Sequence, residues 1–165
     1  MIPNERLLQL AGEAQSVREK YRPQTAEDLE QIAREEYGVA HVVRTPLAKS
    51  QVIKERGSGN LFIFYNAFYE PYLPIVLGHE IGHIAALHLK TRSRNLRKEQ
   101  KEIQEQEADY YAACLNDIPL ATVQHFRSRD AFLSSFGKVR HLFQRELMRQ
   151  EVDRLQKLGV YHWLE

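Results

Sequence analysis

The feature that most constrains this chain is an almost entirely apolar stretch that carries two histidines and a glutamate. It reads LGHEIGHIAAL and covers residues 77–87. At about 100° of rotation per residue, His79 and His83 lie one turn apart on the same face of a helix, where both imidazoles can reach one metal ion. Apolar side chains occupy nearly all of the other faces. We therefore expect this helix to be buried in the core of the protein.

Glu80 lies next to the first of these histidines and completes an H-E-x-x-H pattern. In this pattern two neutral imidazoles hold Zn²⁺ at about 2.0–2.1 Å, and the adjacent carboxylate can accept a proton from water. A buried carboxylate between histidines is costly unless another charge compensates it, which a metal would do. Gly78 and Gly82 indicate close backbone packing or room for a substrate. The alternative is that both histidines are ordinary core residues.

A catalytic zinc ion needs a third protein ligand, and an acidic helix over residues 102–115 can supply one. Three of its glutamates are candidates, namely Glu102, Glu105 and Glu107. We favour Glu105, because Asp109 follows one turn later on the same face and can accept the free ring N–H of a ligating histidine. Glu107 points away from that face. Taken alone, this helix would be read as an ordinary solvated acidic surface.

Together, the two motifs resemble the gluzincin metallopeptidases and, within them, the ImmA/IrrE family. HEIGH at residues 79–83 is followed by EQEADYYA at residues 105–112, which is similar to the E-x-E-A-N-x-F-A motif of that family. The resemblance implies that His79, His83 and Glu105 are zinc ligands and that Glu80 is the general base. Asp109 stands where the family usually has Asn, and it resembles the aspartate of the wider gluzincins that carry E-x-x-x-D.

The same resemblance implies a function. It predicts a zinc-dependent endopeptidase that cleaves a specific regulatory protein, a helix-turn-helix repressor encoded nearby on a phage or other mobile element. An alternative of a different class is a metal-stabilised anti-repressor that binds its partner without cutting it. The presence of Glu80 argues against this alternative, because a pure binder needs no general base. Tyr110 and Tyr111 adjoin the second motif and are considered as donors to the developing oxyanion.

Composition and length limit these expectations. A chain of 165 residues that is 43% hydrophobic and 27% charged fits one metallopeptidase-like domain over residues 1–165. The formal net charge of +1 gives no reason to expect direct binding to nucleic acid or to a membrane surface. The N-terminus lacks the apolar core of a signal peptide, and no run of about 18 apolar residues could span a membrane. These features favour the cytoplasm. Cys114 is expected to be a packed residue.

The predicted fold is α+β and zincin-like, with a small, mostly antiparallel sheet packed on the buried HExxH helix and further helices at both termini. N-terminal helices are expected at residues 5–37, with Thr25 and Asp28 in a capping box at the start of the second. Strands rich in β-branched residues lie between residues 39 and 65, with an antiparallel hairpin at 57–60. The active-site helices span residues 74–115, and periodic apolar residues predict C-terminal helices at 119–159.

Several further residues invite a functional reading that we do not favour. His88 follows His83 on a continuing helix, rotated by about 140°, so it is not expected to be a ligand. The basic run at residues 90–101 is expected to be a solvated loop and helix start. The aromatic connection at residues 66–73 more often caps a core than lines a cleft. His41 is expected to be structural or exposed.

Overall fold

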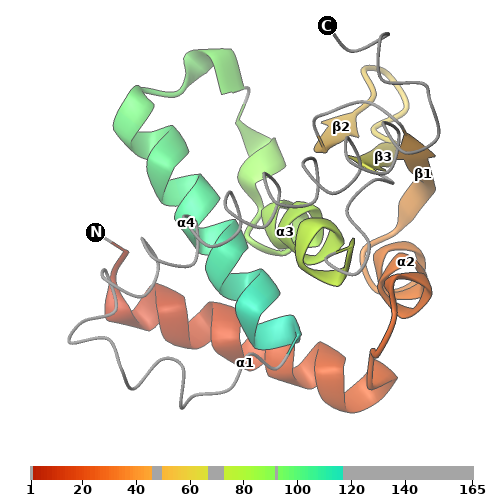
Figure 1. The fold of residues 1–165 in the computed structure, drawn as a ribbon. Helices are drawn as coiled ribbons and strands as arrows, with labels where there is room; N and C mark the ends of the chain where they lie inside the picture. The colour runs from red at the N-terminus through yellow and green to blue at the C-terminus, as the bar shows by residue number, and fades with distance from the viewer. Residues whose placement is uncertain (1, 46–49, 67–72, 92, 117–165) are drawn as a thin grey trace, which may run out of the picture.

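The computed structural model describes residues 2–45, 50–66, 73–91 and 93–116, and this part of the chain has an α+β fold (Figure 1). Its helices are α1 (Asn4–Tyr21), α2 (Ala26–Glu35), α3 (Leu73–Ala85) and α4 (Lys98–Leu115). Its strands are β1 (Val39–Thr45), β2 (Gln51–Lys54) and β3 (Leu61–Asn66). Two 3₁₀ turns, η2 (His88–Lys90) and η3 (Ser93–Asn95), join α3 to α4. The predicted C-terminal helices at 119–159 and the aromatic residues of the connection at 67–72 lie outside the described residues.

The two N-terminal helices form as the sequence predicts. Helix α1 buries one face at helical spacing and ends at Tyr21, and the residue that follows, Arg22, has a left-handed backbone (φ 48) just before Pro23. Helix α2 begins with the predicted capping box. The Asp28 N–H donates to Thr25 Oγ1 at 3.3 Å, and Asp28 Oδ2 accepts from the Thr25 N–H at 2.9 Å. Backbone donors at the start of α2 are thereby satisfied.

The sheet has the order β1-β3-β2. Strands β2 and β3 pair in antiparallel fashion, as predicted, across a hairpin in which Gly57 (φ 90) and Gly59 (φ 73) adopt backbone conformations that favour glycine. Strands β1 and β3 pair in parallel. The sheet is therefore mixed, and the expectation of a mostly antiparallel sheet is wrong in this respect. Short β-branched runs predict strands, but the direction of pairing depends on the path of the chain between them.

Helix α3 occupies the centre of the described fold (Figure 1). It packs against α4 on one side and against α2, β2 and β3 on the other. Leu77 and Ile81 of this helix belong to the main core and have no exposed surface. The prediction that the HExxH helix is buried is confirmed.

Glycines allow α3 and α4 to approach closely. A Cβ atom added at Gly82 would lie 2.7 Å from the carbonyl oxygen of Ala108 and 2.9 Å from its Cα. A Cβ atom at Gly78 would lie 2.9 Å from Asn116 Nδ2. Because the first of these neighbours is backbone, it cannot move aside without shifting the helix. Close packing, one of the two interpretations of these glycines, is confirmed.

Helix α3 ends earlier than the apolar pattern predicts. It stops at Ala85, and Leu87 then adopts a left-handed backbone conformation (φ 61, ψ 27) that turns the chain into η2. The expectation that His88 lies on a continuing helix is therefore wrong. Apolar residues continue to Leu89, and no glycine or proline marks the break, so local sequence carried no signal for this turn.

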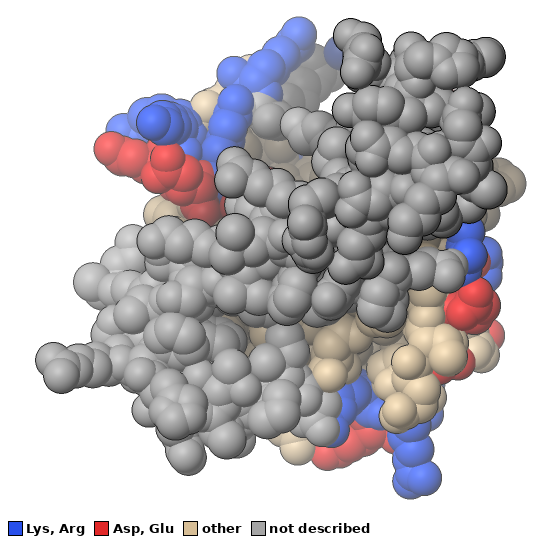
Figure 2. Space-filling view, in the orientation of Figure 1, with Lys and Arg blue, Asp and Glu red and all other residues tan. Residues whose placement is uncertain are grey.

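The described cations of the basic run at residues 90–101, which leads into α4, are exposed, as expected of a solvated segment. Its exposed cations in the described residues are Lys90, Arg94, Arg97, Lys98 and Lys101. Acidic side chains lie beside basic ones around the start of α4 (Figure 2), and Lys98 Nζ lies 3.9 Å from Glu102 Oε1. None of the helices in the described part of the chain is long and apolar enough to cross a membrane.

Candidate metal centre

The three predicted ligands meet where α3 packs against α4. His79 Nε2 and His83 Nε2 are 3.1 Å apart. Glu105 Oε2 lies 3.3 Å from His79 Nε2, and Glu105 Oε1 lies 3.4 Å from His83 Nε2. His79 is buried, His83 is partly buried and Glu105 is exposed, so the site opens on the side of Glu105. Among the described residues, this is the one group of three or more His, Cys, Asp and Glu side chains with the spacing of metal ligands.

The spacing of these atoms fits a metal. Ligand atoms that surround a metal tetrahedrally at about 2.0–2.2 Å lie about 3.3–3.6 Å from one another. The observed separations of 3.1, 3.3 and 3.4 Å agree with this range to within about 0.2 Å. Two imidazole nitrogens and one carboxylate oxygen are also a donor set that zinc favours. The residues present therefore fit a zinc ion.

Asp109 orients the first histidine. His79 Nδ1–H donates to Asp109 Oδ1 at 2.7 Å, and both side chains are 5% exposed. A neutral imidazole that carries its proton on Nδ1 bears a lone pair on Nε2, and Nε2 is the atom that faces His83 and Glu105. The structure thus places Asp109 where the sequence predicted a partner for a ligating histidine.

His83 has a different partner, which the sequence did not predict. His83 Nδ1 lies 2.9 Å from His88 Nδ1, and His88 Nε2 donates to Glu107 Oε2 at 2.7 Å. Arg6 on α1 donates through Nε to Glu107 Oε1 at 3.2 Å and through Nη2 to Glu107 Oε2 at 3.1 Å. His88 is 8% exposed and Glu107 is 7% exposed. These contacts join α1, η2 and α4 behind the candidate metal centre.

The carboxylates of α4 have perturbed acidities. The adjacent imidazoles of His79 and then His83 hold the pKa of the Glu105 carboxyl well below its usual value. Burial opposes ionisation of Glu107, but hydrogen bonds from His88 and Arg6 outweigh it and lower the pKa of that carboxyl. Both groups are therefore anionic at neutral pH. A cation among His79, His83 and Glu105 would compensate the charge of Glu105.

Burial also changes the acidity of His88 and Cys114. It lowers the pKa of the His88 imidazole, against the hydrogen bond to Glu107, which raises it. It also raises the pKa of the Cys114 thiol, in keeping with a packed cysteine. Glu80 is 5% exposed and follows His79 directly on α3.

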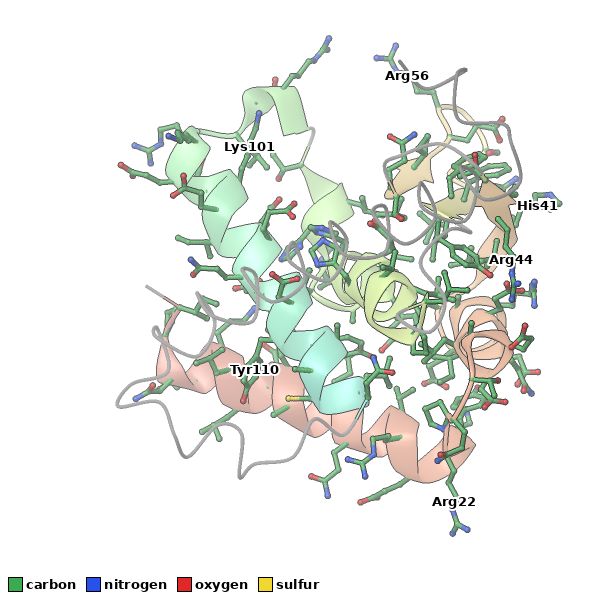
Figure 3. The ribbon with its side chains drawn as sticks, viewed as in Figure 1. Arg22, His41, Arg44, Arg56, Lys101 and Tyr110 are labelled. Carbon is green, nitrogen blue, oxygen red and sulfur yellow. The ribbon has the colours of Figure 1, made fainter. Side chains whose placement is uncertain are left out.

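The two tyrosines considered as oxyanion donors have different positions. The Tyr111 hydroxyl lies 2.5 Å from the Tyr37 hydroxyl, and Tyr37 donates to Glu13 Oε1 at 3.1 Å. Because Tyr111 has no exposed surface, it is a core residue and cannot reach a substrate. Tyr110 projects from α4 over α1 (Figure 3), where it packs against the core.

Comparisons with models of known families, with curated proteins and with solved structures give no match. The fold and the site define the chain as an α+β protein with a His/His/Glu group that can hold a metal ion.

Proposed function

We propose that this protein is a zinc-dependent endopeptidase with a zincin-like fold. The observation that carries the proposal is the convergence of His79, His83 and Glu105 on one point, with Glu80 buried beside the first ligand. The position of α3 between the sheet and a second ligand-bearing helix gives further support. So does the resemblance of HEIGH and EQEADYYA to the motifs of the ImmA/IrrE gluzincins.

His79, His83 and Glu105 would hold the zinc ion. When bound by three protein ligands, zinc lowers the pKa of its water to about 7 and polarises a carbonyl group. Glu105, at the exposed side of the group, contributes the negative charge that offsets part of the cation. Asp109 holds the proton of His79 on Nδ1 and so keeps the Nε2 lone pair directed at the site.

Glu80 would be the general base. Its carboxylate accepts one proton from the attacking water as the oxygen bonds to the peptide carbonyl carbon. The same carboxyl then gives that proton to the amine as the C–N bond breaks, so Glu80 ends the cycle ionised. Glu80 is buried and follows His79 directly on α3, which supports this role.

We further propose that the substrate is a regulatory protein, specifically a repressor of the helix-turn-helix type. The support for this part is the family resemblance of the two motifs. An anti-repressor that binds the same partner without hydrolysis would need the metal group but not Glu80. The fate of the partner therefore distinguishes the two functions.

The first experiment measures zinc per chain by elemental analysis of untagged wild-type protein and of Glu105→Ala. We expect about one zinc in the wild type and a clear loss in the variant, because three protein ligands are reduced to two. Glu102→Ala is the matched control, since Glu102 lies on the same helix and is exposed. If the wild-type protein holds no zinc, even after zinc is supplied and the excess removed, the proposal of a zinc enzyme is refuted.

In the second experiment, a helix-turn-helix repressor encoded next to this protein is incubated with the wild type and with Glu80→Gln. Mass spectrometry follows the fragments. We expect the variant to retain zinc and to lose hydrolysis, because glutamine cannot accept the proton. Equal release of intact repressor from its operator by both proteins would instead establish the binding function.

A further inference from the structure

A histidine that binds metal through Nε2 needs a hydrogen-bond acceptor at Nδ1. The neutral ring carries its one proton on Nδ1, and the partner of that N–H fixes both the tautomer and the plane of the ring. For His79 this acceptor is the carboxylate of Asp109. For His83 the facing atom is His88 Nδ1, at 2.9 Å.

Glu107 decides which of these two nitrogens is the donor. Its carboxylate already accepts from Arg6 on both oxygens, at 3.2 and 3.1 Å. A carboxylate has no proton to give, so His88 Nε2 must be the donor in the contact of 2.7 Å. When His83 binds metal through Nε2, the one proton of that ring lies on Nδ1 and occupies the contact with His88. His88 Nδ1 is then the acceptor, and His83 Nε2, which faces His79 and Glu105, is left for the metal.

We propose that His88 is a positioning residue, which sets His83 in the tautomer and orientation that bind metal, and that Glu107 and Arg6 set His88 in turn. The proposal rests on the metal centre of the proposed function, and it does not depend on what the enzyme cleaves. It gives the two histidine ligands two different supports, a carboxylate for His79 and a neutral imidazole for His83.

The hydrogen bonds that connect His83 through His88 and Glu107 to Arg6 form a relay. Contacts of α1, η2 and α4 hold it in place. Arg6 Nη2 donates to the Ala86 carbonyl at 2.6 Å, which ties the start of α1 to the end of α3. The left-handed turn at Leu87 then brings His88 back against His83. The side chains of His88 and Glu107 are both buried, so water cannot readily replace either of them as a hydrogen-bond partner.

Two variants of similar shape separate positioning from packing. In His88→Asn the side-chain oxygen can accept where Nδ1 accepted, whereas His88→Leu has no acceptor. His41→Leu is the matched control, because His41 is exposed on β1 at the far edge of the sheet (Figure 3). Zinc affinity is measured by competition with a chromogenic chelator, and circular dichroism reports the folded fraction of each protein.

We expect His88→Leu to bind zinc about 10–100-fold more weakly than the wild type, and His88→Asn to recover most of that loss. His41→Leu should bind like the wild type. Wild-type affinity in His88→Leu, or an equal loss in His88→Asn and His88→Leu, would overturn the proposal. A wild-type protein that binds no zinc would instead count against the proposed function.

Nuclear magnetic resonance of zinc-loaded wild-type protein tests the relay without a variant. Long-range ¹⁵N–¹H spectra of the histidine rings identify which nitrogen carries the proton. We expect the proton on Nδ1 of His83 and on Nε2 of His88. A proton on Nδ1 of His88 in the zinc-loaded protein would refute the relay.

Discussion

At the scale of single residues, the candidate centre depends on the direction of a few buried hydrogen bonds. An imidazole has two nitrogens, and the partner of one decides whether the other presents a lone pair or an N–H. For His79 this partner is Asp109, whose Oδ1 accepts from Nδ1–H at 2.7 Å. Both side chains of this pair are buried, so water does not readily provide an alternative partner. Substitution of such a partner should therefore weaken metal binding as well as the fold.

Asp109→Leu tests this expectation. We expect zinc affinity to fall about 10–100-fold, because His79 Nδ1–H loses its acceptor and the ring is no longer fixed. The free energy of unfolding of the zinc-free protein should fall by about 1–3 kcal/mol, the cost of a buried donor left without a partner. Chelator competition and urea denaturation measure the two quantities.

Asp109→Asn is the control, because its carbonyl oxygen can still accept from His79. Its zinc affinity should stay within a few-fold of the wild type. If the Leu variant also binds zinc as tightly as the wild type, Asp109 does not support the ligand.

At the scale of elements, the site exists because two helices approach closely. The Gly82 backbone faces the Ala108 backbone, and this contact brings His79 and His83 on α3 to Glu105 on α4. Elsewhere, elements are fixed by local chemistry. Thr25 and Asp28 begin α2 with reciprocal hydrogen bonds that involve only neighbouring residues. The two kinds of contact predict different responses to substitution.

Gly82→Ala should weaken both the fold and the metal centre. Alanine favours helix over glycine by about 1 kcal/mol, but a Cβ atom 2.7 Å from a backbone oxygen forces α3 and α4 apart. We expect a net loss of about 1–3 kcal/mol in the free energy of unfolding, together with weaker zinc binding.

Gly12→Ala is the matched control for this substitution. Gly12 lies on α1, and nothing lies within 4 Å of the added Cβ atom. We expect a gain of up to about 1 kcal/mol there, measured by the same urea denaturation. A Gly82→Ala protein as stable as Gly12→Ala would show that the close approach is not required.

The capping box of α2 should make a small contribution to stability that depends on pH. Backbone N–H groups of Gln24 and Thr25 hydrogen-bond the Asp28 carboxylate and lower its pKa below 3.8. Because the folded pKa is depressed, the contribution is complete above the unfolded value and is lost as pH falls through the folded value. Asp28→Asn should be less stable than the wild type at pH 7, by no more than about 1 kcal/mol for so exposed a group.

Denaturation at a series of pH values tests this prediction. The difference between wild type and Asp28→Asn should shrink as the pH falls below about 3.8. A difference that stays constant down to the lowest pH would contradict the assignment of the effect to the carboxylate.

At the scale of the whole molecule, a metal would link parts of the chain that are far apart in sequence. His79 and His83 lie on α3 and Glu105 on α4, while Arg6 connects α1 to both the end of α3 and Glu107 on α4. Helix α3 is at the centre of these contacts, with the sheet on its other side. A ligand that binds only the folded arrangement stabilises the entire domain.

Zinc should therefore raise the melting temperature of the protein. At a free zinc concentration 100 times the dissociation constant, the added stability is about 2.7 kcal/mol. A chelator should reverse the shift, and Glu105→Ala should show a much smaller one. Differential scanning calorimetry with and without zinc measures it, and an unchanged melting temperature at saturating zinc would contradict a site formed by the native fold.

Local chemistry made much of this protein predictable from the sequence. The i, i+4 spacing places His79 and His83 on one helical face, and the same spacing places Glu105 beside Asp109. The capping box at Thr25 and the hairpin at Gly57 likewise involve residues that are close along the chain, so their geometry follows from backbone preferences. The convergence of α3 and α4 was expected because a metal needs a third ligand.

Only the tertiary structure decided the parallel pairing of β1 with β3 and the end of α3 at Ala85. It also decided that Glu107 accepts from His88 and Arg6. None of these features follows from a local pattern, because each depends on how segments far apart in sequence pack in the core. Leu87 is the clearest case, since an apolar residue gives no local reason to adopt φ 61, and yet that turn places His88 against His83.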